Sequence, residues 1–361
     1  MVLIVALVLL TFAPQALAQG DAADRTVGEV MRDIDRWKIP LLGIGALLVL
    51  AILVAGGLLR PGGFEKAGLR DIGPLGWPVW IFAALIVLLA QSSAHGILVG
   101  TGALDRLGGE DGLSGEQASI VIALAGYAFG AIAGFGMLYI LHKSAPEGGL
   151  RVSLVDLPLG FGCFILAYPL VQLAAIGAVA LYQSFQDGRR PDPIAHDVLQ
   201  RIHEQFATNT QDVWTWLTIT AAVLGAPIVE ELVYRVFIQS ALLKMLKSPW
   251  VSIITTSLIF TGMHRAVAGD GAPVPWHALI PIFALGVTMG VAYERSRRVG
   301  VPIAMHMCFN ALMVTLTILG SGEPRSVDGA SERQGQRQSE RVREPRPDAE
   351  EPDPRYMERV P

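Results

Sequence analysis

Long apolar stretches, separated by short polar segments, constrain the fold of this chain more than any other feature. Eight of them approach the ~20 mostly apolar residues that a helix needs to cross the ~30 Å hydrocarbon core of a bilayer. They cover residues 40–59, 77–100, 119–141, 158–182, 213–244, 250–268, 276–294 and 302–320. Because lipid cannot satisfy exposed backbone polar groups, such stretches must be helical. The sequence therefore predicts an all-α fold, a polytopic transmembrane bundle of about eight helices.

The composition favours the same environment. Hydrophobic residues make up 52% of the chain and charged residues only 17%, whereas a soluble domain carries about 25% charged residues. The net charge of -4 provides no basic surface, so no nucleic-acid partner is expected. Cys163 and Cys308 lie in apolar stretches and are too few for a disulfide framework. The expected partner of most of the surface is the lipid bilayer.

The two ends of the chain differ from the helical region. Residues 1–18 resemble a secretory signal, because an apolar run from Val2 to Phe12 precedes small residues in an A-x-A pattern, although no basic residue precedes the run. Residues 19–39 are polar and are predicted to lie outside the membrane. Residues 321–361 are rich in Arg, Glu and Pro and poor in large apolar side chains, which predicts a disordered, charged tail.

The helical region is expected to have two parts and a defined orientation. N-terminal transmembrane helices over 40–182 precede a loop over 183–212, whose amphipathic stretch 196–206 predicts an interfacial helix, and residues 213–320 form the second part. If the segment before the first helix lies outside, the cytoplasmic loops hold ten basic residues and the outer loops between helices five, although residues 19–38 add four more outside. With the secretory start and polar tail, this predicts an integral protein of a bacterial inner membrane.

Ionisable residues inside apolar helices are the features that point to chemistry. Glu230 and Glu231 lie near the middle of a helix, where one charged side chain costs ~2.5–3.5 kcal/mol on insertion scales. Arg235 stands one turn beyond Glu231 and can pair with it, whereas Glu230 lies about 100° further round the helix and can point into the bundle. Because burial disfavours the charged form of an unpaired carboxylate, Glu230 is suited to accept a proton from water. A purely structural ion pair is the alternative for Glu231 and Arg235.

Two other apolar helices of the C-terminal half carry similar residues. His264 ends an apolar run, and His306 and Asn310 lie four residues apart on one face of the last helix. A lone histidine in such a helix is often only a buried core residue. It is the combination of two acids, an arginine, two histidines and an asparagine in three helices that predicts a catalytic site.

In their order, these residues resemble the motifs of the CPBP family, the CAAX-protease and bacteriocin-processing intramembrane proteases that are also called the Abi family. The resemblance spans roughly residues 213–320 and follows an E-E-x-x-x-R, an F-x-x-x-H and an H-x-x-x-N motif. The motif residues are Glu230, Glu231, Arg235, Phe260, His264, His306 and Asn310. The resemblance implies an intramembrane endopeptidase that acts on a peptide or membrane-protein substrate.

The resemblance also implies roles for these residues. Glu230 would activate the attacking water with help from His264, while Glu231 and Arg235 would support the helix and orient Glu230. His306 and Asn310 would donate hydrogen bonds to the tetrahedral intermediate, and Phe260 would pack beside the site.

A metal is the open question of this site. Glu230, His264 and His306 could hold Zn²⁺ and leave a coordination position open. The same residues also work as a metal-free glutamate protease. Asn310 suits an oxyanion donor better than a zinc ligand, so we expect a metal-free site, with zinc as the alternative cofactor.

Other chemistries fit the sequence less well. A zinc site-2 protease needs H-E-x-x-H, but the His203-Glu204 pair is followed by Ala207 where the second histidine should be. A rhomboid would need a G-x-S-G serine in a spanning helix, and no predicted spanning helix contains one. An aspartyl intramembrane protease would need two aspartates in the membrane, but Asp270 stands alone in a polar loop. A non-catalytic scaffold or immunity-type relative and a proton-coupled transporter remain alternative functions. The complete set of motif residues disfavours the scaffold, and the lack of a polar file across the bilayer disfavours the transporter.

Simple helix counting raises one difficulty for the predicted site. Glu230 and His264 would each lie ~20 Å from the cytoplasmic end, but His306 would lie only ~6–12 Å from it. The residues meet only if the helix of His306 begins earlier than predicted or the other helices tilt, and Pro227 can supply a bend.

Overall fold

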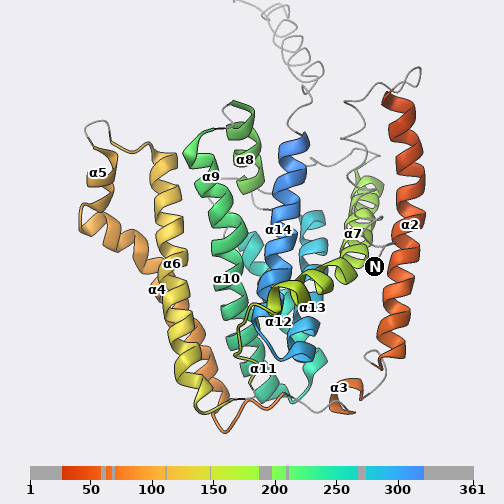
Figure 1. Ribbon diagram of the computed structural model, residues 1–361, viewed down its shortest axis with the longest axis horizontal. Helices are drawn as coiled ribbons and strands as arrows, with labels where there is room; N and C mark the ends of the chain where they lie inside the picture. The colour runs from red at the N-terminus through yellow and green to blue at the C-terminus, as the bar shows by residue number, and fades with distance from the viewer. Residues whose placement is uncertain are drawn as a thin grey trace, which may run out of the picture. The chain divides into compact units, whose positions relative to one another are not determined.

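A computed structural model gives the fold of residues 27–57, 62–66, 70–109, 112–146, 148–186, 197–208, 211–266 and 274–320 (Figure 1). These residues are almost entirely helical, and the part of the chain just given contains no β-strand. The predicted signal segment and the predicted tail lie outside the described residues.

The helices follow one another along the chain with short connections. Their bounds are α2 (Val27–Ala55), α3 (Gly63–Lys66), α4 (Trp77–Gly100), α5 (Ala103–Gly108), α6 (Gly115–His142), α7 (Asp156–Phe185), α8 (Asp197–Thr208), α9 (Val213–Thr220), η2 (Ala221–Gly225), α10 (Ala226–Glu231), η3 (Leu232–Ile238), α11 (Gln239–Leu246), α12 (Pro249–Ala266), α13 (Trp276–Ser296) and α14 (Gly300–Gly320). The segments from α9 to α11 run on as one long helix (Figure 1), in which η2 and η3 are π-helical. The helix predicted within the loop 183–212 is present as α8.

Six of the described helices are long and apolar enough to cross a membrane. They are Trp77–Gly100, Gly115–His142, Asp156–Phe185, Val213–Leu246, Trp276–Ser296 and Gly300–Ile318. The other two predicted spans are also helical, but Pro40–Ala55 is a shorter apolar stretch, and α12 contains Ser, Thr, His and Arg among its apolar residues. The predicted class, a polytopic helical membrane bundle, is confirmed.

Glycines on α6 allow this helix to approach the long α9–α11 helix closely. A Cβ atom added to Gly130 would lie 3.1 Å from the side chain of Val229, and one added to Gly134 would lie 2.7 Å from that of Leu232. In lipid, such close backbone approach gains van der Waals contact where the exclusion of water gives little. The spacing of four residues therefore packs α6 beside the turn that carries the two glutamates.

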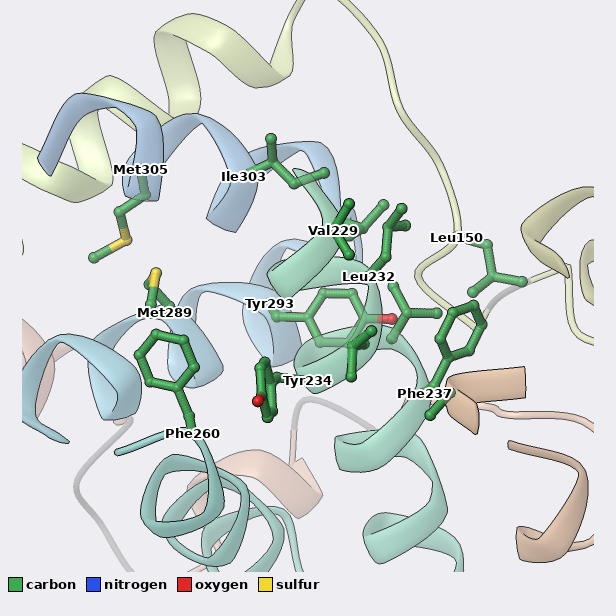
Figure 2. Packing of buried hydrophobic residues seen from close by; sticks show 14 of the residues in the cluster. Leu150, Val229, Leu232, Tyr234, Phe237, Phe260, Met289, Tyr293, Ile303 and Met305 are labelled. Carbon is green, nitrogen blue, oxygen red and sulfur yellow. The ribbon is translucent and has the colours of Figure 1, made fainter. Parts of the chain in front are cut away.

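The core of the bundle lies around the same turn of the helix. Figure 2 shows buried side chains of this region. Leu232 and Phe237 of the long helix belong to the same cluster as buried residues of α12, α13 and α14. Both side chains are completely buried. The glutamates thus stand on the best-packed part of the long helix, which limits their freedom of movement.

One end of the bundle is tied together by Arg70, which lies in the connection before α4. Its Nε and Nη2 atoms donate to Glu294 of α13 at 3.2 and 2.9 Å. Its Nη1 atom donates to the carbonyl of Gly148, to Ser240 and to Tyr293 at 2.7, 2.8 and 3.2 Å. Burial alone would lower the pKa of Arg70, but Glu294 and Tyr293 together outweigh this effect and raise that pKa above its ordinary value. We call this network the Arg70 clamp.

Candidate active site

The two glutamates end α10, a short α-helical segment that lies between two π-helical segments. In η2 the N–H of Ala226 bonds to the carbonyl of Ala221, five residues earlier. In the same register the carbonyl of Ala222 would accept from residue 227, but Pro227 has no N–H group. π-Helical turns occur frequently at functional sites, and here one leaves a backbone acceptor about two turns before Glu230.

Asn310 of α14 bonds to this acceptor. Its Nδ2 atom donates to the carbonyl of Ala222 at 2.8 Å, so the side chain replaces the N–H that Pro227 lacks. A carboxamide carries two N–H groups, and this bond uses one of them. Asn310 thereby bonds α14 to the long helix about two turns before the glutamates.

Glu231 is held from both sides and is completely buried. Its Oε2 atom accepts from Nε of Arg235 at 3.0 Å, so the predicted pairing is present. Its Oε1 atom lies 3.0 Å from Nδ1 of His306. Because both carboxylate oxygens are engaged, Glu231 joins the long helix to α14 and sets the orientation of the His306 ring.

Glu230 has a different environment from its neighbour. Its side chain retains 27% exposure, and its Oε2 atom lies 3.9 Å from Nε2 of His306, on the other side of the ring from Glu231. This separation is too long for a direct hydrogen bond, and polar atoms so placed are commonly bridged by water. His306 thus lies between the two glutamates, one fixed and one accessible.

The ring of Phe260 lies at the centre of the remaining site residues. The rings of His264, Tyr234 and His306 pack edge-on against it, with centroids 4.5, 5.1 and 5.9 Å away. The guanidinium of Arg235 lies over its face, 5.4 Å from the centroid. Phe260 therefore packs against both motif histidines and gives them a shared apolar wall. The sequence had given Tyr234 no role, and its only signal was its place beside Arg235.

His264 lies in the last turn of α12. Its Nδ1 atom is 2.9 Å from the carbonyl of Phe260 in the preceding turn. In a neutral ring this contact assigns the proton to Nδ1 and leaves Nε2 as an acceptor.

The predicted zinc ligands do not form a metal site in this arrangement. Among the described residues, no three His, Cys, Asp or Glu side chains lie close enough together to hold a metal ion. Zinc would need His264, His306 and Glu230 within about 2.0–2.2 Å of one point.

Helix counting predicted that His306 lies at a different depth from the glutamates, but in the structure they meet. The helix α14 begins at Gly300, two residues before the predicted start at 302. The long helix changes register on both sides of the glutamates, in η2 and in η3. His306 and Glu231 lie at the same level of the bundle, since Nδ1 of His306 is 3.0 Å from Oε1 of Glu231.

Comparison with known protein families agrees with this geometry. Residues 212–312 match the family described as Type II CAAX prenyl endopeptidase Rce1-like. The match begins at the residue before α9 and ends within α14, so it contains every motif residue. Comparison with curated proteins and with solved structures gives no significant match. The predicted resemblance is thus confirmed: residues 212–312 of this integral membrane protein match an Rce1-like CAAX-endopeptidase domain, which is consistent with the CPBP family and supports an intramembrane endopeptidase.

Proposed function

We propose that this protein hydrolyses a peptide bond within the membrane by using water that Glu230 activates. The observation that carries the proposal is the position of His306, which lies 3.0 Å from the buried Glu231 and 3.9 Å from the accessible Glu230. A buried site that gives two adjacent carboxylates such different surroundings separates a structural acid from a reactive one.

The charges of the cluster support this division. Two carboxylates face the Arg235 guanidinium and the His306 ring, so a protonated His306 makes the four groups neutral together. Buried charges are tolerated when they are paired in this way. Glu231 engages Arg235 and His306 with its two oxygens and is left without a free oxygen for catalysis, whereas Glu230 keeps an oxygen for water.

The proposed reaction begins with a water molecule between Glu230 and the scissile carbonyl. Glu230 accepts a proton as the water oxygen bonds to the carbonyl carbon, and Nε2 of His264 helps to hold this water. Negative charge moves from Glu230 to the carbonyl oxygen, where Nε2–H of His306 and the second N–H of Asn310 stabilise it. Glu230 then returns the proton to the amine as the C–N bond breaks. Water is consumed and the carboxylate is regenerated.

A Glu230→Gln variant in detergent, assayed with a quenched peptide, tests the proposal. Removing a general base should lower the cleavage rate about 10²–10⁴-fold. The matched control is Glu116→Gln, since Glu116 bonds to Gln205 of α8 and belongs to no motif. Unchanged cleavage by Glu230→Gln would overturn the mechanism.

For the substrate we propose a peptide or a membrane-protein segment close to the bilayer surface, and for the location a bacterial inner membrane. N-terminal proteomics would compare membranes that contain the wild-type protein with membranes that contain the Glu230→Gln variant. New termini that require Glu230 would identify the cleavage sites, and identical sets of termini in a strain that makes active enzyme would contradict this substrate class.

A further inference from the structure

An open groove lies at the end of α6, and none of the residues that line it is a proposed catalytic residue. It has a volume of about 400 Å³ and is bounded by the last two turns of α6, by residues 150–153 and by Arg298. These segments lie at the ends of α6, α7, α13 and α14, where the loops predicted to be cytoplasmic come together. The ends of membrane-spanning helices lie near the lipid headgroups, so the groove opens at that depth.

The floor of the groove is apolar. Leu138 and Leu150 are buried beneath it, and both belong to the cluster that contains Leu232 of the long helix. Phe135 and Val152 form its walls and are substantially exposed. In a membrane these exposed side chains contact lipid, and the groove offers an acyl chain a continuous apolar surface.

The rim of the groove is basic. His142, Arg151 and Arg298 line it, and Lys143 lies beside them with its ammonium 5.1 Å from the centroid of the Tyr139 ring. Arg298 is neutralised by its ion pair with the buried carboxylate of Asp156. Within the described ranges, Arg151 and Lys143 have no carboxylate partner. The described rim therefore carries excess positive charge.

The segment that carries Arg151 is held in place by its backbone. Leu150 and Arg151 form β-bridges with Arg298, and the N–H of Val299 donates to the carbonyl of Gly149 at 3.0 Å. Gly149 has a positive φ of 82°, which favours glycine. The groove is thus formed in advance, and a ligand need not order the loop when it binds.

We propose that this groove binds an anionic phospholipid, with the phosphate at Arg151 and Lys143 and one acyl chain along Phe135 and Val152. Basic pockets between membrane-spanning helices recognise anionic headgroups. The apolar floor requires a ligand that also carries a hydrocarbon chain, which distinguishes a lipid from a soluble anion. The proposal does not depend on catalysis.

Lipid retention measured by native mass spectrometry tests this site on the full chain, after incubation with phosphatidylglycerol or phosphatidylcholine. We expect preferential retention of phosphatidylglycerol, and we expect Arg151→Gln to weaken it roughly fivefold, the effect of one basic residue near an anionic surface. Val152→Trp fills the groove without changing its charge and should abolish the preference. Lys247→Asn is the control, because Lys247 is exposed at the same end of the bundle but outside the groove.

Several results would overturn the site. Equal retention of the two lipids would remove the role of charge. Full retention by Val152→Trp would reduce the interaction to diffuse surface attraction, as would equal losses in Arg151→Gln and Lys247→Asn. Displacement of the lipid by inorganic phosphate alone would assign the rim to a soluble anion. Thermal unfolding of each variant verifies that it is folded, and all the substituted side chains are exposed.

Discussion

The Arg70 clamp and the candidate active site both place a buried arginine against a glutamate, yet the two arginines are satisfied very differently. All three guanidinium nitrogens of Arg70 donate hydrogen bonds. Arg235 donates from Nε to Glu231, while its buried Nη1 and Nη2 atoms have no hydrogen-bond partner among the described residues. Unsatisfied buried donors are rare in stable cores. The Arg70 clamp thus satisfies every guanidinium nitrogen of its arginine, whereas the candidate site leaves two buried donors of Arg235 unsatisfied by the described residues.

The clamp should have the largest effect on stability. Arg70→Gln strands the buried carboxylate of Glu294, and breaking such a pair costs about 3–5 kcal/mol. Unfolding of the variant in detergent should reveal a loss of this size, and the double variant Arg70→Gln/Glu294→Gln should recover part of it. A single variant as stable as the wild type would show that the clamp contributes nothing.

Conservative substitution of the two arginines sharpens the comparison. Arg70→Lys loses several bonds, and each hydrogen bond to a charged group contributes about 1.5–3 kcal/mol. Arg235→Lys can keep its ion pair with Glu231, so it should lose less stability but more cleavage activity. The free energy of unfolding and the cleavage rate would be measured for both variants. The opposite ranking in either measurement would remove the distinction between clamp and site.

A smaller effect is expected where Asn310 replaces the N–H that Pro227 lacks. Asn310→Ala should destabilise the protein by about 0.5–1.5 kcal/mol, the contribution of one hydrogen bond. In a Pro227→Ala background the new N–H can bond to Ala222, and the same substitution should then cost less. A double-mutant cycle of unfolding free energies measures this coupling. Additive effects would mean that the two residues act independently.

The smallest effect is expected from metal removal. Since the arrangement of His264, His306 and Glu230 does not converge on a metal-binding point, prolonged treatment with a chelator should leave the cleavage rate unchanged. Loss of activity that added Zn²⁺ restores would favour the zinc alternative.

The sequence was sufficient for the helical class and for the pairing of Glu231 with Arg235, because both depend on local patterns. Apolar length predicts membrane helices, and the spacing of Glu231 and Arg235 predicts their contact within one helix. The bond from Asn310 to the carbonyl of Ala222 was not predictable, since it joins two helices that lie far apart in the sequence.

Long-range contacts explain the remaining omissions. Arg70 and Glu294 are 224 positions apart, and no periodicity of either segment indicates that they meet. Glu294 lies near the end of α13, where a sequence reading assigns an acid to the solvent, yet the clamp buries it. Tyr234 was missed for a similar reason, because its contact with Phe260 joins two separate helices.

The division between one reactive and one structural glutamate is tested most directly by measuring cleavage and unfolding together in Glu230→Gln and Glu231→Gln. We predict that Glu230→Gln loses cleavage while its unfolding stays close to that of the wild type. Glu231→Gln should lose both, since it weakens the bonds to Arg235 and His306. Cleavage at the wild-type rate by Glu230→Gln, with Glu231→Gln inactive but fully stable, would contradict the account and exchange the two roles.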